Sequence, residues 1–70
     1  MITIATLNSL NEAHLLRSML ESSEIPAFIP DENTAQADWT LINAMGGIRV
    51  QVPESFREEA KKIVADYNSN

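Results

Sequence analysis

The stretch that most constrains the fold is residues 46–53, where two glycines lead into Ile-Arg-Val-Gln-Val and a proline ends the run. The three apolar residues of this run alternate with Arg49 and Gln51, which is the two-residue period of a strand with one buried face and one wetter face. Glycine and proline are typical of turns, so both ends of the strand are marked. The pattern predicts the central strand of a small sheet, with Arg49 and Gln51 on its open face.

Two further stretches predict the strands on either side of it. Residues Ile2–Leu7 are short and either β-branched or apolar. The two isoleucines of this stretch share one face, which we expect to be buried, and alternation then places Thr3, Ala5 and Leu7 on the open face. Residues 25–29 predict another strand, in which Phe28 faces the open side. Pro26 cannot donate to a ladder, so this strand lies at an edge or begins at the proline.

Two helices are predicted from capping signals and from apolar spacing. Ser9 and Glu12 have the S-x-x-E spacing of a capping box, and Ser55 and Glu58 repeat it. The first helix should run from Leu10 to about Ser22, and the second should follow Ser55. Each carries one apolar stripe at helical spacing. The stripes are Leu10, Ala13, Leu16 and Leu20 in the first helix, and Phe56, Ala60, Ile63, Val64 and Tyr67 in the second.

The order strand, helix, strand, loop, strand, helix predicts one α+β domain over residues 1–70. A right-handed crossover makes the first two strands parallel, and the last strand then inserts between them, antiparallel to both. This is a truncated ferredoxin-like β-α-β-β-α two-layer sandwich, with a three-stranded mixed sheet and both helices on one face. The complete fold has a fourth strand beside the first, so we expect Ile2–Leu7 to be an open edge.

Composition excludes several classes of function. The formal net charge is −5 and the chain has only five Lys and Arg residues, which argues against binding to nucleic acid or to an anionic membrane. There is no cysteine, so disulfide scaffolds, cysteine zinc sites and thiol catalysis are excluded, and a reducing cytoplasm is the expected location. No apolar run approaches the ~20 residues of a transmembrane helix.

A core this small contributes little net stability, which makes association a way to bury more surface. Ile2–Leu7 carries no charge and no proline, the usual devices that protect an edge strand. We therefore expect a homodimer formed through this edge or through the open sheet face. The alternative is a monomer in which the loop 30–45 covers that surface.

Several segments together resemble a known family. The matching residues are Asn11-Glu12-Ala13 with Leu16 and Leu20, then Ile25-Pro26-Ala27, the glycine-led strand 48–53, and Glu59-Ala60. They resemble the small bacterial domains of unknown function labelled prokaryotic signal-transducing proteins, over roughly residues 3–66. The resemblance implies a PII-like, ferredoxin-like fold and a signalling role, and it brings no catalytic residue. The chain departs at Glu24, where the family usually has a glycine that would cap the helix in the left-handed conformation.

Three further features of the sequence could suggest a metal, catalytic or phosphate site, but each favours a structural role. His14 has no evident metal or proton-transfer partner, so a solvated surface position is expected. Asp31, Glu32 and Asp38 form an acidic cluster, in which Asp31 and Asn33 match part of a calcium-loop pattern. The glycine and the final glutamate of that pattern are missing, so a solvated acidic loop is expected. The glycines at 46 and 47 lead into a strand and not into a helix, which favours a turn or bulge over a phosphate-binding loop. We predict no metal and no cofactor.

The binding residues we predict are Trp39, Phe28 and Arg49. Trp39 follows a polar loop and either anchors the core or lines a partner surface. Arg49, on the open face, either holds an anion or carboxylate or pairs with a local acid. No Ser-His-Asp set or paired catalytic carboxylates are present. The sequence therefore predicts a non-enzymatic regulatory module that binds an unknown protein or small molecule. The alternative is a structural assembly domain that acts through its edge strand or sheet face.

Overall fold

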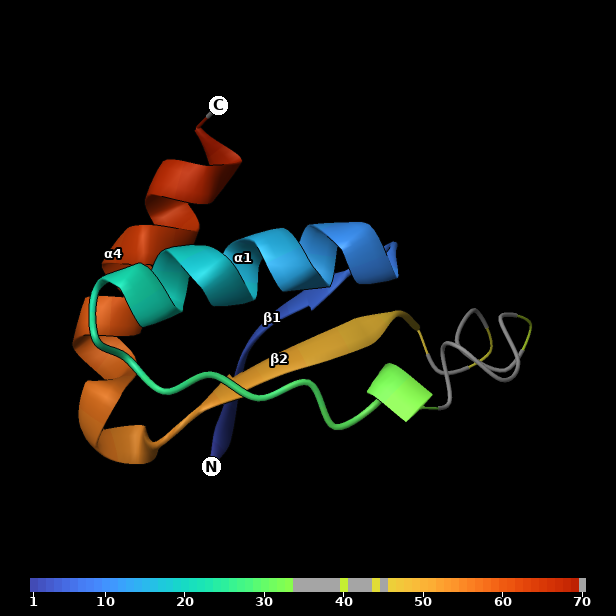
Figure 1. The fold of residues 1–70 in the computed structure, drawn as a ribbon, viewed down its shortest axis with the longest axis horizontal. Helices are drawn as coiled ribbons and strands as arrows, with labels where there is room; N and C mark the ends of the chain where they lie inside the picture. Colours follow the sequence, from blue (N-terminus) through green and yellow to red (C-terminus); the bar gives the residue numbers. More distant parts are fainter. Residues whose placement is uncertain (34–39, 41–43, 45, 70) are drawn as a thin grey trace.

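The computed structural model describes residues 1–33, 40, 44 and 46–69 (Figure 1). Along the chain it has strand β1 (Ile2–Leu7), helix α1 (Leu10–Ser22), strand β2 (Ile48–Val52), the 3-10 turn η1 (Glu54–Phe56) and helix α4 (Arg57–Asn68). β1 and β2 form a two-stranded antiparallel sheet. The predicted α+β class and the predicted elements at these positions are confirmed, with one strand fewer in the sheet than expected.

One hydrophobic core joins the two helices to one face of the sheet. The predicted inward residues of β2 are all buried, and they pack with residues of both helices and with two isoleucines that follow α1. The buried apolar residues are Ala13, Leu16, Leu20, Ile25, Ile29, Ile48, Val50, Val52 and Ala60. α1 packs mainly on β2 and α4 on β1, and the two helices touch each other.

Helix α1 begins and ends through backbone hydrogen bonds that its sequence favours. The Ser9 hydroxyl accepts a hydrogen bond from the N–H of Glu12 at 3.1 Å, so the predicted N-cap is confirmed. At the other end, the N–H of Glu24 donates to the carbonyl of Glu21, and the N–H of Ile25 donates to the carbonyl of Leu20. This pair of bonds is a Schellman ending, in which the residue at Glu24 must be left-handed.

Glu24 does adopt that conformation, with φ of 63°. A left-handed conformation costs an ordinary L-residue roughly 1–2 kcal/mol, whereas glycine adopts it freely. The ending therefore forms without a glycine at this position, at the expense of local strain. Ile25 and Leu20, which this ending brings together, are both buried and stabilise it.

We expect Glu24→Gly to raise the free energy of unfolding by about 0.5–1 kcal/mol, because the relief of strain exceeds the extra entropy that glycine gives the unfolded chain. Urea denaturation measures this change. Glu24→Ala removes the carboxylate but keeps the strained Cβ, so it should give no such gain. An equal gain from both variants would show that charge, and not backbone strain, is responsible.

A bulge in β1 changes which of its residues face the core. Ile2 pairs with Val52 and Thr3 with Gln51, but the next partner, Val50, lies opposite Ala5, so Ile4 is an extra residue. Past the bulge, Ala5 and Leu7 lie opposite buried residues of β2 and are themselves half-buried against the core. The predictions that Ala5 and Leu7 lie on the open face are therefore wrong, and Thr6 takes that face opposite Arg49.

The predicted third strand at 25–29 is reduced to one bridge. Phe28 and Gln51 exchange two backbone hydrogen bonds of 2.8 Å in antiparallel register, so β2 lies between β1 and this segment as predicted. In that register the next hydrogen-bonded pairs are 26 with 53 and 30 with 49. Residues 26, 30 and 53 are all prolines and have no N–H to donate. The ladder therefore does not continue on either side of the Phe28–Gln51 pair, and the prediction of a three-stranded sheet is wrong.

The second predicted capping box does not form. Ser55 lies inside the 3-10 turn η1, and neither η1 nor α4 has a side-chain hydrogen bond at its N-cap. Pro53 and Phe56 occupy the two cap positions, and neither side chain has an oxygen that accepts a hydrogen bond. The chain therefore enters α4 through a tighter turn, which ends where Arg57 begins the helix.

Candidate functional site

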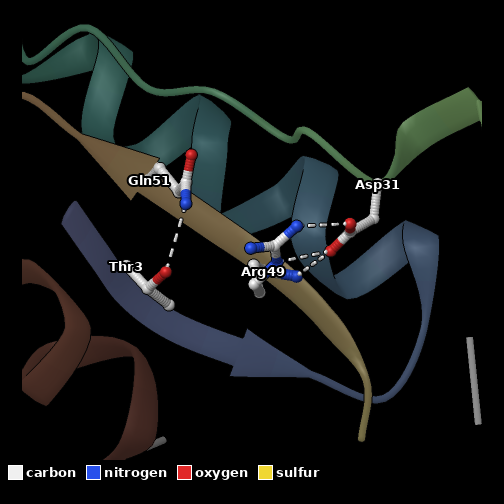
Figure 2. A network of polar contacts seen from close by, with 4 residues as sticks. All are labelled: Thr3, Asp31, Arg49 and Gln51. Atoms are coloured by element: carbon white, nitrogen blue, oxygen red, sulfur yellow. Dashed lines mark hydrogen bonds and ion pairs between the residues drawn. The ribbon is translucent and has the colours of Figure 1, made fainter. Parts of the chain in front are cut away.

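The candidate site is the open sheet face, which we define as the side chains of Thr3, Thr6, Phe28, Arg49 and Gln51. Residues directly opposite each other in an antiparallel pair share a face. The pairs Thr3 with Gln51, Thr6 with Arg49 and Phe28 with Gln51 therefore place all five on the side away from the helices. Figure 2 shows part of this face, where the Gln51 amide donates to the Thr3 hydroxyl at 3.2 Å.

Asp31 holds Arg49 through three hydrogen bonds. The guanidinium Nε donates to Asp31 Oδ2 at 3.1 Å and Nη2 donates to Oδ1 at 2.9 Å, which is the two-point geometry of a strong arginine–carboxylate pair (Figure 2). The backbone N–H of Arg49 also donates to Oδ2 at 3.1 Å. That N–H lies where a third strand would have offered a carbonyl, so the Asp31 carboxylate extends the ladder beyond Pro30.

The two partners of this ion pair differ in their exposure to solvent. The Asp31 side chain is 4% exposed and that of Arg49 is 44% exposed. The bound Arg49 side chain lowers the pKa of Asp31 through its hydrogen bonds, against the opposing effect of burial, and its backbone N–H adds to the lowering. The guanidinium pKa is raised by the same pair. The cation, and not the carboxylate, is therefore what this site presents to a partner.

A second side-chain contact involves Glu32, the residue after Asp31. His14 Nε2 on α1 lies 3.2 Å from Glu32 Oε2, with both side chains about one-third exposed. His14 therefore lies at the surface as predicted, but the prediction that it has no partner is wrong, because it contacts Glu32. The acids Asp31 and Glu32 point to different layers, one to β2 and the other to α1. Together they attach the start of the 30–45 segment to both layers of the domain.

The structure brings together two of the three predicted binding residues. Phe28 is 58% exposed and faces the open side, as expected from alternation. Phe28 and Arg49 both flank Gln51, one across the bridge and one two residues back along β2. Trp39 and Asp38 lie outside the described residues. Gly46 and Gly47, both with positive φ, lead into β2, consistent with the predicted turn or bulge.

Sequence reasoning missed Asp31 as the partner of Arg49. Asp31 was expected in a solvated acidic loop, whereas it is buried and accepts three hydrogen bonds from Arg49. The position of Asp31 relative to Phe28 could have indicated this contact. Once Phe28 is placed opposite Gln51, position 30 lies opposite Arg49, and an acid directly after Pro30 falls within reach of that arginine.

No group of three or more His, Cys, Asp or Glu side chains in the described part of the chain is placed to hold a metal ion. Within the same residues, none of the helices has the length and apolar character needed to span a bilayer.

These features define a small α+β domain with an exposed aromatic and a fixed arginine on a sheet face that no described element covers. The chain matches the family described as "Putative prokaryotic signal transducing protein" over residues 1–68, and it belongs to that family. Searches among curated proteins and among solved structures found no significant match.

Proposed function

We propose that this chain is a non-enzymatic regulatory module that recognises a partner protein through its open sheet face. The observation that carries the proposal is the exposed Phe28 beside an Arg49 whose guanidinium is fixed by Asp31. Aromatic and arginine side chains are the residues that most often dominate the energetics of protein interfaces. Membership of the signal-transducing family supports a regulatory role.

Both binding residues are held in place before a partner arrives. The backbone of Phe28 is fixed by two hydrogen bonds to Gln51, and Arg49 is fixed at its backbone and at its guanidinium. Ordering flexible side chains costs roughly 0.5–1.5 kcal/mol each on binding, so a fixed arginine loses less. A guanidinium has five N–H donors, and Asp31 uses two of them. The others suit a carboxylate or a backbone carbonyl of the partner.

The proposal also covers the fold type of the module, its location in the cell and the extent of its binding surface. The module has the truncated ferredoxin-like, PII-like arrangement, with the 25–29 segment in the place of the third strand. It acts in the cytoplasm, which the cysteine-free sequence supports. Trp39 extends the binding surface from the 30–45 segment. A small molecule is the alternative ligand, and it would use the same arginine.

Phe28→Ala is expected to abolish capture of the partner protein from a bacterial lysate while the domain stays folded, because Phe28 already lies mostly in solvent. Arg49→Lys should weaken capture, since lysine keeps the charge but loses the two-point geometry. Quantitative mass spectrometry of the captured proteins, with circular dichroism of each bait, measures this. Leu15→Ala removes an equally exposed apolar side chain from α1 and is the matched control. Partners retained by Phe28→Ala and lost by Leu15→Ala would place binding on the helical layer instead.

A further inference from the structure

The outer edge of β1 has an unusual spacing of backbone hydrogen-bonding groups. Gln51 gives its backbone N–H and C=O to Phe28, and the N–H of Arg49 donates to Asp31. These groups of β2 therefore point away from β1, so the pairs of Gln51 with Thr3 and of Arg49 with Thr6 are of the non-hydrogen-bonded kind. Thr3 and Thr6 must then direct their own backbone groups outward, to the edge that no described strand occupies.

The bulge at Ile4 sets these two outward residues three positions apart. In a regular strand, residues that point to the same side are two apart. A regular partner strand that pairs with Thr3 therefore has no hydrogen-bonding residue opposite Thr6. This is how a bulge normally protects an edge strand from unwanted pairing. The edge thus rejects most strands, although it carries neither charge nor proline.

A second copy of β1 has the required spacing, because it carries the same bulge. In an antiparallel pair related by a two-fold axis, Thr3 of each copy can lie opposite Thr6 of the other. Both outward residues are then matched, and the two bulges meet at the axis. β1 contains no charged residue, so two chains of net charge −5 can meet along it without a like charge in the strand contact. The spacing of the outward backbone groups and the absence of charge in β1 both favour a second copy of β1 as the strand that pairs with this edge.

We propose that two copies of this chain associate through β1 as a two-fold antiparallel pair, with Thr3 of one copy opposite Thr6 of the other. Thr3 and Thr6 also belong to the open sheet face, but this contact uses their backbone groups at the edge and not the side chains of Phe28 and Arg49. The proposed contact gives the alternative function, a structural assembly domain, a defined surface and a defined strand register. A six-residue edge is a small contact, so the association is expected at the weak end of specific interfaces.

The association is tested by sedimentation of the full chain from about 10 µM to about 1 mM, the range in which a small interface is populated. Dimer is expected for the wild type and for Thr6→Val, which keeps the backbone N–H. Thr6→Pro should be monomeric and folded, because it removes an N–H that the β1–β2 ladder does not use. Phe28→Ala should still dimerise. A wild-type monomer at the highest concentration would overturn the proposal, as would a dimer that persists in Thr6→Pro.

The register is tested by disulfide formation, since the chain has no cysteine of its own. Opposed residues lie within the 4.4–6.8 Å Cα separation that a disulfide needs. Thr3→Cys chains mixed with Thr6→Cys chains should form the mixed dimer at least several-fold faster than either variant alone forms its own dimer. Equal rates, or faster linkage of Thr6→Cys to itself, would contradict the predicted register. Since each variant keeps Phe28 and Arg49, neither result depends on the proposed partner-binding role.

Discussion

Asp31→Ala is expected to lower the free energy of unfolding by about 2 kcal/mol, among the largest effects for a residue outside the apolar core. The variant removes the carboxylate that accepts three hydrogen bonds from Arg49, and it leaves the N–H at that edge of β2 without its partner. It also detaches the chain after Pro30 from the sheet. Urea denaturation at pH 7 measures the loss.

The neighbouring acid is the matched control for this prediction. Glu32 contacts His14 at 3.2 Å, but both side chains are partly exposed. Such pairs contribute little, so Glu32→Ala should change the free energy of unfolding by no more than about 0.5 kcal/mol. A loss from Glu32→Ala as large as that from Asp31→Ala would show that the site depends on total acidity and not on the buried pair.

The same pair predicts a dependence on pH whose sign follows from the lowered pKa of Asp31. A carboxyl whose pKa is lower in the folded state contributes stability above its unfolded value of about 3.9, and this contribution is lost as pH falls through the folded pKa. The stability difference between the wild type and Asp31→Asn should therefore be constant near neutral pH and shrink below about pH 4. A difference that stays constant down to pH 2 would contradict the assignment.

Gly47→Ala is expected to lower the free energy of unfolding by about 3 kcal/mol, because strain and steric overlap add. Gly47 has φ of 123°, and a Cβ there would lie 2.8 Å from the backbone oxygen of Leu7 and 2.9 Å from the Thr6 side chain. β1 ends and β2 begins at this contact. The backbone of Leu7 cannot move without disturbing its pair with Ile48.

Gly46→Ala separates the cost of a positive φ from the cost of steric overlap. Gly46 also has a positive φ, of 88°, but an added Cβ there would meet no atom of the described structure within 4 Å. Its cost should be the conformational one alone, about 1 kcal/mol. Thermal and urea unfolding of the two variants compares them directly. Similar losses from both would show that the close approach of Gly47 to β1 is not what requires glycine.

The parts of the fold that the sequence predicted are those with a strong local pattern. β2 has strict alternation and marked ends, and its position between β1 and the 25–29 segment follows from chain order. The start of α1 depends on one serine and the residues directly after it. The exposure of Phe28 follows from alternation in a segment of five residues. In each case the controlling interaction lies within a few residues or within one periodic stripe.

The parts that were missed depend on pairings between distant segments. The bulge at Ile4 has no local signature, since β1 is apolar or β-branched on both sides of it. The single bridge at Phe28 follows from prolines at 26, 30 and 53, but only after the register is known. The ion pair of Asp31 with Arg49 joins residues 18 positions apart across that same register. Register is the information that local patterns do not carry.

The most direct test of the central claim is an NMR titration of the isotope-labelled chain with its captured partner protein. The reporters of the open sheet face are the methyl groups of Thr3 and Thr6 and the ring of Phe28, and the reporter of the helical layer is the exposed Leu15. The account predicts that the three face signals shift or broaden on binding while the Leu15 methyls stay in place. Shifts confined to Leu15 and α4, with the face signals unchanged, would contradict it.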